Sequence, residues 1–403
     1  MLTAVLTSDN HLGAYYARFR PDRLEERRRT LQRAFTQVVD AALERRADLF
    51  LHAGDLYDRP DPRNAERAFV AEQVRRLLDA GVPVCAIAGN HDSPRSYGYD
   101  GGTLPHKELE ALGAIHLLEG RGKLLKTTIR VRNHTICVWG MSHDPNLAPA
   151  SCPLERVVAE HSRSGDLDLV LLHHGVEEWT PPFVREKEAV LSRAHLEQLQ
   201  TDAIGVGHLH AHNATRLHSG AMLMNPGATE HMNFGDEHLE CGFYVLHWDG
   251  RQVEAEYIRL TPQPMRTLAV KVTERSEQNP EELLPWLMGQ IQAISDPRQL
   301  LRLRLQGRVR DTHMPHLPLG DLQARGSEQN FHCELETSGL VFYNALADLP
   351  LGYGVSFDAG EELQNVAAAV LALYADDPTE QEICRLAAER LAADYSHLTG
   401  GAR

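Results

Sequence analysis

The sequence predicts an α/β fold in which two β-sheets form a sandwich that is flanked by helices. Five short apolar runs alternate with helical stretches over the first 260 residues, as expected of strands that helices connect. Each run leads to an Asp, Asn or His, and strands of α/β sheets place binding residues beyond their carboxyl ends. We therefore expect these polar groups to meet in one crevice. The runs span residues 4–7, 48–51, 82–88, 169–172 and 203–206.

Helices and further strands complete this first domain, residues 1–260. Apolar periodicity predicts helices over residues 31–45 and 65–78, and an Arg-rich segment precedes the first of them. Three later runs have β character, and we expect them to be antiparallel strands that complete the second sheet. They span residues 221–224, 242–248 and 253–260.

A proline-containing connector separates a second domain. Pro262 and Pro264 suit an extended linker and neither a helix interior nor a central strand. Beyond it the pattern predicts a strand over 267–273, a helix over 280–294 and a strand over 301–305. We expect a small α+β domain over residues 261–345.

The last segment, residues 346–403, reads as helical. Apolar residues recur at spacings of three and four from residue 363 to 374. A second helix follows Asp377-Pro378-Thr379-Glu380, which places Asp at the N-cap, Pro at the first helical position and Glu at the third. Two short amphipathic helices of this kind suit a docking element.

Composition narrows the function classes. The 403-residue chain has no apolar run near the ~18 residues of a membrane span, and its six Cys residues form no C-x-x-C pair. We expect a soluble cytoplasmic protein. The formal net charge of −15 argues against a protein that coats nucleic acid with basic groups. DNA remains possible as a substrate, because bound divalent cations would reverse the local field where a phosphate approaches.

The polar ends of the runs provide the donors for two metal ions. Asp55 is the natural bridge, because a carboxylate can give one oxygen to each ion whereas an imidazole cannot. Mixed imidazole and oxygen donors suit Mn, Fe or Zn better than Ca or Mg, so we expect two divalent metals, with Mn²⁺ first and Fe or Zn behind it. The seven expected ligands are Asp9, His11, Asp55, Asn90, His173, His208 and His210.

Two ions held together suit the in-line displacement of a phosphoester oxygen by water. His91, next to an expected ligand, is assigned to stabilising the phosphorane or protonating the leaving oxygen. His52 and His174 are expected to orient ligands from behind. We expect the remaining histidines, such as His143, His212 and His231, to be surface or loop groups.

The residues around these motifs resemble a known family. The segments are Ser8-Asp9-Asn10-His11-Leu12-Gly13, Leu51-His52-Ala53-Gly54-Asp55-Leu56-Tyr57-Asp58, Ala88-Gly89-Asn90-His91-Asp92-Ser93-Pro94 and Leu172-His173-His174-Gly175-Val176. They resemble the SbcD and meiotic-recombination-eleven family of DNA repair nucleases, within the calcineurin-like metallophosphoesterase superfamily. The resemblance covers nearly all of residues 1–240 and implies the metallophosphoesterase fold.

The resemblance also implies roles for individual residues. One metal would be held by Asp9, His11, Asp55 and His210, and the other by Asp55, Asn90, His173 and His208. His91 would be the catalytic histidine. Asn10 and His174 depart from the family pattern, but neither replaces a ligand. The small domain would cap the site over DNA, and the terminal helices would dock an ATPase.

By the same resemblance, the protein would act as a 3′ to 5′ exonuclease on DNA ends and as an endonuclease on single strands or hairpins. Its partners would be an SbcC-like coiled-coil ABC-type ATPase in a double-strand-break repair complex, and a second copy of itself. Residues 63–78 and a helix around 106–112 are the candidate dimer helices.

Two arginine groups are candidates for DNA contact. Arg18, Arg20 and Arg23 belong to the Arg-rich segment that ends at Arg29, and Arg302 and Arg304 alternate with leucines on the strand of the small domain. Each group is equally well explained as phosphate-binding or as the solvated charge of a helix or half-buried strand.

Two other functions remain open at this point. A phosphodiesterase or phosphatase for a small substrate, such as a cyclic nucleotide, would share every ligand but need no cap, dimer or docking helices. A non-catalytic scaffold would use the fold only to bind DNA ends or the ATPase, but it would have no reason to keep seven ligands and His91 together.

Overall fold

The structure is a computed structural model that describes residues 1–94, 102–343, 382, 384–387 and 390. The chain forms two compact units. The first comprises Met1–Arg266 and Arg298–Leu300, and the second Thr267–Pro297 and Leu301–Arg403.

The first unit contains two six-stranded sheets. In the first sheet, four parallel strands are extended at one edge by two antiparallel ones, in the order β14-β13-β1-β2-β3-β4. Their bounds are β1 Leu2–Thr7, β2 Leu49–Ala53, β3 Val84–Ile87, β4 His116–Leu117, β13 Gly242–Trp248 and β14 Val253–Arg259.

The second sheet has the order β11-β12-β10-β7-β6-β5. Strands β6, β7, β10 and β12 are parallel, and β5 and β11 pair antiparallel at the two edges. The bounds are β5 Leu125–Val131, β6 His134–Met141, β7 Leu167–His173, β10 Ala203–Gly207, β11 Asn213–Arg216 and β12 Met222–Asn225. The predicted fold class, a two-sheet sandwich with helices, is confirmed.

The expectation for the last strands of this unit was wrong in part. We expected three antiparallel strands in the second sheet. Instead, β12 pairs parallel to β10, and β13 and β14 extend the first sheet beside β1. β propensity predicts an extended conformation, but it does not say which free sheet edge the strand will pair with.

One apolar core lies between the two sheets, and a second lies between the first sheet and its helices. On β2, Leu49 and Leu51 belong to the apolar cluster that contains residues of both sheets, whereas Phe50 faces the helical side. This pattern buries both faces of the strand, as expected for a parallel sheet covered by helices.

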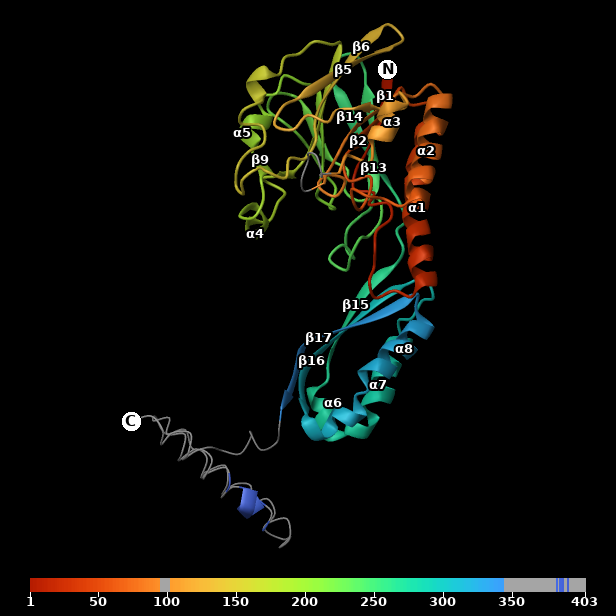
Figure 1. Ribbon diagram of the computed structural model, residues 1–403, viewed down its shortest axis with the longest axis vertical. Coiled ribbons are helices and arrows are strands. Elements are labelled where there is room, and N and C mark those ends of the chain that lie inside the picture. The colour runs from red at the N-terminus through yellow and green to blue at the C-terminus, as the bar shows by residue number, and fades with distance from the viewer. Residues whose placement is uncertain (95–101, 344–381, 383, 388–389, 391–403) are drawn as a thin grey trace, which may run out of the picture. The chain divides into compact units, whose positions relative to one another are not determined.

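Two long helices cover the outer face of the first sheet. Helices α1 (Pro21–Glu44) and α2 (Asn64–Asp79) lie on the same side of the unit (Figure 1), contact each other and pack with the outward residues of β1 and β2. Helix α1 begins ten residues before the predicted start, because the Arg-rich segment is itself helical. Pro21 stands at its first position and Asp22 in its first turn, both favourable there.

Short elements fill the rest of the first unit. Strands β8 (Gly175–Val176) and β9 (Val190–Leu191) pair parallel just after β7. The helices are α3 Lys107–Ala111, the 3₁₀ turn Val158–Glu160, α4 Pro182–Arg185 and α5 Arg193–Leu196.

The second unit is an α+β domain with the three-stranded sheet β15-β16-β17. Its elements are β15 Met265–Lys271, α6 Thr273–Gln278, the 3₁₀ turn Pro280–Glu282, α7 Leu283–Gln292, β16 Leu300–Arg310, the 3₁₀ turn Asp311–His316, α8 Leu319–Gln329 and β17 His332–Tyr343. On β16, Leu301, Leu303 and Leu305 are buried in the core of this unit, while Arg302 and Arg304 alternate with them.

The terminal helical element predicted for residues 346–403 lies almost wholly outside the described residues. Among the helices that the structure describes, none is both long and apolar enough to cross a membrane.

Candidate metal centre

The seven predicted ligands follow five strands that run parallel within their sheets. Asp9 and His11 follow β1, Asp55 follows β2 and Asn90 follows β3 in the first sheet. In the second sheet, His173 ends β7, and His208 and His210 follow β10. Because the carboxyl ends of these strands lie at one end of the sandwich, residues that are two hundred positions apart can meet.

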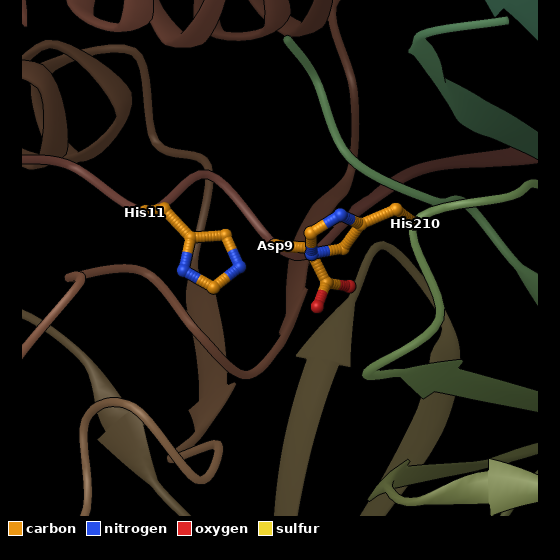
Figure 2. Close-up of side chains that lie close together, drawn as sticks. All are labelled: Asp9, His11 and His210. Carbon is orange, nitrogen blue, oxygen red and sulfur yellow. The ribbon is translucent and has the colours of Figure 1, made fainter. Parts of the chain in front are cut away.

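Three of the predicted ligands form one group. Single ligand atoms of Asp9, His11 and His210 lie within 4.8 Å of one another. Figure 2 shows these three side chains gathered together, with the carboxylate of Asp9 beside the ring of His210. The backbone N–H of His208 also donates to both carboxylate oxygens of Asp9, at 3.0 and 3.1 Å.

The remaining four ligands form a second group. Oδ1 of Asn90 lies 3.0 Å from Nε2 of His173 and 3.0 Å from Nδ1 of His208. Nε2 of His173 lies 3.2 Å from Oδ2 of Asp55. Donors bound to one divalent ion at roughly 2.0–2.2 Å are about 3 Å apart, so this spacing fits a shared ion.

Asp55 connects the two groups. Its carboxylate lies within 4.8 Å of ligand atoms of Asp9 and His173, and Oδ2 is 3.8 Å from Nε2 of His11. The structure therefore places between the groups the one side chain that we expected to bridge the ions.

The backbone of the centre is strained. Asp9, His11, Asp55 and His208 have φ values of 51°, 46°, 55° and 100°. Among the described residues only three other non-glycine residues have positive φ, so the strain is concentrated at the predicted ligands. Residues with side chains avoid this region, and such strain persists mainly where function requires it.

In three of the predicted ligand histidines, one ring nitrogen lies within hydrogen-bonding distance of a protein oxygen. Nδ1 of His173 lies 2.7 Å from the carbonyl oxygen of Ala53. Nδ1 of His210 lies 2.9 Å from Oδ2 of Asp236, and Nε2 of His208 lies 3.1 Å from both carboxylate oxygens of Glu188. These contacts leave Nε2 of His173 and His210, and Nδ1 of His208, to face the centre.

The carboxylates of the centre favour positively charged neighbours. Burial acts to lower the pKa of His11, but contact with Asp58 and the charges of Asp55 and Asp9 raise it to about 9. Burial also acts to lower the pKa of His173, but the charge of Asp55 outweighs it and raises the pKa of His173 to about 9. The pKa of Asp55 lies well below its usual range, because neighbouring imidazoles outweigh its burial. A divalent cation would neutralise this surplus of carboxylates.

The residues present fit two divalent metal ions. His11 is buried, and among the described residues its ring nitrogens make no hydrogen bond: Nδ1 lies 3.5 Å from Oδ1 of Asp58 and Nε2 3.8 Å from Oδ2 of Asp55. A buried polar atom without a partner is costly unless a ligand satisfies it. The donor set of imidazole, carboxylate and one amide oxygen suits Mn, Fe or Zn.

His91 lies at the rim of the centre. Its ring is 44% exposed, and Nδ1 lies 3.1 Å from the carbonyl oxygen of Asp58 and 3.6 Å from its carboxylate. The rings of His91 and His11 meet edge to face at 4.6 Å. The position is open to a substrate, while Asp58 holds the inner nitrogen.

His52 forms hydrogen bonds with two of the ligand loops of the first sheet, through Gly54 and Asn10. Nδ1 accepts the backbone N–H of Gly54 at 3.2 Å, so Nε2 carries the proton and donates to Oδ1 of Asn10 at 2.6 Å. Asn10 in turn donates to Thr229 at 3.0 Å. Burial lowers the pKa of His52 to about 3, which keeps the ring neutral.

His174 takes no comparable position. It is buried, and neither ring nitrogen has a hydrogen-bond partner among the described residues. Its ring lies 4.9 Å from that of His143, in the loop after β6, and burial holds the pKa of His174 well below its usual value. No hydrogen bond connects His174 to a predicted ligand in the described structure, so an orienting role for it stays a prediction.

Four of the five candidate DNA-binding arginines form ion pairs with carboxylates. Arg20 lies 2.7 Å from Asp22 and Arg23 3.0 Å from Glu26 on α1. Arg18 is exposed at the same end of the helix. In the second unit, the pairs are Arg302 with Glu334 at 2.6 Å and Arg304 with Glu336 at 3.0 Å.

Not every arginine of the Arg-rich segment is available for DNA. Arg27 is buried, 3.2 Å from Glu230, and donates to Gln263 at 3.0 Å. Arg28 is buried and donates to the carbonyl oxygen of Ala14 at 3.2 Å. These two side chains hold the fold together.

Sequence reasoning missed four carboxylates at the centre. Asp58 and Asp92 lie within the motifs themselves, so their spacing from Asp55 and Asn90 could have identified them. Glu188 and Asp236 stand in loops without a recognisable pattern. Only the fold brings those two beside His208 and His210.

Comparison with known proteins adds a family and several relatives. The model of the calcineurin-like phosphoesterases matches residues 2–212. A DNA double-strand break repair protein Mre11 from Sulfolobus acidocaldarius is 26% identical over 310 residues, which cover 75% of this chain and 74% of that protein. An Mre11 protein from Sulfurisphaera tokodaii is 29% identical over 232 residues, which cover 55% of this chain and 52% of that protein.

The similarity is uneven along the chain. The Mre11 protein of Aeropyrum pernix is 47% identical, but only over 87 residues, which cover 22% of this chain and 20% of that protein. Among solved structures, a dimetal phosphatase from Danio rerio matches 64% of this chain and 96% of its own at 12% identity, with a TM-score of 0.39.

Proposed function

Because this chain belongs to the calcineurin-like phosphoesterase family, we propose that it is a two-metal DNA phosphodiesterase of double-strand-break repair. It is a metal-dependent phosphodiester hydrolase. One observation carries the proposal: seven metal donors from five strand ends form two groups that share Asp55.

We assign the donors to two sites. Site A consists of Asp9, His11, Asp55 and His210, and site B of Asp55, Asn90, His173 and His208. When bound, two divalent ions supply an activated water and charge stabilisation for in-line displacement at phosphorus. Mn²⁺ is the proposed metal, with Fe and Zn as the alternatives that the same donors accept.

The proposed role of His91 follows from its position. Asp58 holds Nδ1 through its carbonyl oxygen, so Nε2 is the nitrogen that can meet a substrate. From there the ring can stabilise charge on the phosphate or give a proton to the leaving oxygen, a contribution of about 10²–10⁴-fold. The backbone N–H of His91 donates to Oδ1 of Asp55 at 2.8 Å, which fixes the main chain of His91 relative to both sites.

DNA is the proposed substrate because several relatives are DNA double-strand break repair proteins. Arg18, Arg20 and Arg23 in the first unit and Arg302 and Arg304 in the second are the proposed phosphate contacts. The pairing of Arg20 and Arg23 with carboxylates does not exclude this, because exposed ion pairs are worth only about 0–1 kcal/mol and can be exchanged for a phosphate. We propose that the small domain expected over residues 261–345 acts as the cap.

We also propose how the protein cleaves DNA and which partners it binds. We expect 3′ to 5′ exonuclease action on DNA ends, endonuclease action on single strands or hairpins, and a complex with an SbcC-like ATPase. A homodimer would use α2 and α3, where Leu78 and Leu112 are 39% and 80% exposed. Sedimentation at micromolar concentration should show a dimer, and a monomer alone would contradict this part.

The test compares substrates. The purified chain is incubated with Mn²⁺ and end-labelled duplex, hairpin or single-stranded DNA, and in parallel with a small chromogenic phosphodiester. We expect DNA cleavage that is lost on chelation with EDTA and restored by Mn²⁺. Hydrolysis of the small ester alone, with DNA intact even after an SbcC-like ATPase is added, would favour a small-molecule phosphodiesterase instead.

A further inference from the structure

His208 makes a contact that the seven-ligand assignment does not explain. Its Nε2 lies 3.1 Å from both carboxylate oxygens of Glu188. Glu188 comes from the segment between α4 and β9 and belongs to none of the motifs. Nδ1 of His208, 3.0 Å from Oδ1 of Asn90, is the nitrogen assigned to the metal; with Nδ1 as a ligand, Nε2 carries the proton and donates it to Glu188.

The fold holds Glu188 in this place. Its carbonyl oxygen accepts the backbone N–H of Ala150 at 3.0 Å, and the pairing of β9 with β8 ties the segment to the end of β7. Gly175 makes room for the carboxylate, since a Cβ there would lie 3.2 Å from Oε1 of Glu188. Glu188 is therefore held next to β9, whose partner β8 directly follows His173 at the end of β7.

Asp236 makes the equivalent contact with the other group. Its Oδ2 lies 2.9 Å from Nδ1 of His210 and also accepts the backbone N–H groups of Met232 at 2.8 Å and Asn233 at 3.2 Å. Three donors to one oxygen fix the carboxylate. Nε2 of His210 is therefore the nitrogen that faces Asp9.

The two carboxylates serve different sites. Glu188 contacts only His208 among the predicted ligands, and Asp236 contacts only His210. His173, by contrast, is oriented by a backbone carbonyl. A carboxylate behind a ligating histidine fixes the tautomer and raises the basicity of the ring, and its loss typically weakens metal binding by about 10–100-fold.

We propose that Glu188 and Asp236 are positioning residues that tune the two metal sites separately, Glu188 acting on site B through His208 and Asp236 acting on site A through His210. This rests on the proposed two-site assignment. The affinity of either ion can then be changed without altering a ligand. Neither residue contacts the substrate.

The experiment measures Mn²⁺ binding to the full-length apoprotein by isothermal titration calorimetry, without any substrate. Glu188→Gln and Asp236→Asn remove a charge but preserve shape. Each variant should bind one of two Mn²⁺ ions about 10–100-fold more weakly and the other with unchanged affinity. The melting temperature of the apoprotein should stay close to that of the wild type.

Ligand backgrounds identify which ion is affected. In Asn90→Ala, which damages site B alone, adding Asp236→Asn should still weaken binding of the ion in site A, and adding Glu188→Gln should not. In His11→Ala, which damages site A alone, adding Glu188→Gln should weaken binding of the ion in site B, and adding Asp236→Asn should not. Glu178→Gln is the matched control, because Glu178, in the loop between β8 and α4, pairs with Arg193, 3.0 Å away. It should leave both affinities unchanged.

The outcomes separate this inference from the proposed function. Wild-type protein that binds fewer than two Mn²⁺ ions would contradict the two-metal centre itself. Two ions in the wild type, with both affinities within twofold in Glu188→Gln and Asp236→Asn, would overturn only the positioning roles. Equal weakening of both ions together with a lower apoprotein melting temperature would also overturn them, because it indicates a general structural defect.

Discussion

The backbone N–H of His91 donates to Oδ1 of Asp55 at 2.8 Å, so the proposed proton donor is fixed to the proposed bridging ligand through its main chain. The imidazole itself is not part of this contact. A change of side chain at residue 91 can therefore remove the chemistry without removing the link to the metal sites.

His91→Ala should lower kcat for Mn²⁺-dependent DNA cleavage by about 10²–10⁴-fold, because it removes the ring that stabilises or protonates the departing oxygen. Binding of two Mn²⁺ ions should be preserved, as calorimetry can show. His238→Ala, at a side chain that is 88% exposed, is the control and should keep full activity. Wild-type kcat in His91→Ala would assign the chemistry to another group.

Asp92 joins the two ligand loops. Its fully buried carboxylate accepts the backbone N–H groups of Leu56, Tyr57 and Gly89 at 3.2, 2.8 and 3.0 Å. In Asp92→Asn one oxygen becomes an NH₂ group that cannot accept, so at least one buried N–H loses its partner. We expect a loss of roughly 1–3 kcal/mol in the free energy of unfolding, measured by urea denaturation.

Asp249→Asn provides the comparison for Asp92. Asp249 also accepts two backbone N–H groups, from Arg251 and Gln252, but in an exposed turn where water can replace it. This variant should lose much less stability. Equal losses at the two positions would show that burial of the loop junction is not what makes Asp92 important.

The lowered pKa of buried His52 predicts that the stability of the protein depends on pH. Its folded-state pKa is lowered by burial to about 3, against about 6.5 in the unfolded chain, so between these values the unfolded state binds the extra proton. The stability that neutral His52 provides is therefore complete above about pH 6.5 and is lost as the pH falls. The stability advantage of the wild-type apoprotein over His52→Gln should shrink by roughly 2 kcal/mol between pH 7.5 and 5. A constant difference in urea unfolding over this range would refute the assignment.

Arg302 and Arg304 can be tested through the salt dependence of DNA binding. If both contact phosphates, the double variant Arg302→Gln/Arg304→Gln should bind all DNA sequences more weakly. It should also reduce the slope of log K against log salt by up to about 2. The carboxylate of Glu336 lies 3.0 Å from Arg304 and 3.6 Å from Arg302. Glu336→Gln removes this charge but keeps both arginines, so it should not flatten the slope. An unchanged slope in the arginine variant would leave these side chains as strand surface only.

The sequence predicted the fold class because strand and helix periodicities are local. The alternation of Leu301, Leu303 and Leu305 with arginines and the apolar runs before Asp9 and Asp55 can be read without knowing the fold. Sheet membership is not local. Strands β13 and β14 join the first sheet because its edge beside β1 is free, which no pattern in either strand records.

The same distinction explains what was found of the site. The seven predicted ligands stand at fixed spacings after strands, and the structure brings all of them together. Glu188 and Asp236 could not be predicted, because each acts from a loop on a histidine that is distant along the chain, 20 and 26 residues away. A pairing of this kind becomes visible only when the loops are placed.

The most direct test of the two-metal centre is anomalous diffraction at the manganese edge from crystals of the full chain grown with Mn²⁺. We predict two anomalous peaks about 3.5–4 Å apart. One should be bound by Asp9, His11 and His210 and the other by Asn90, His173 and His208, with Asp55 coordinating both. A single peak, or two peaks that do not share Asp55, would contradict the account.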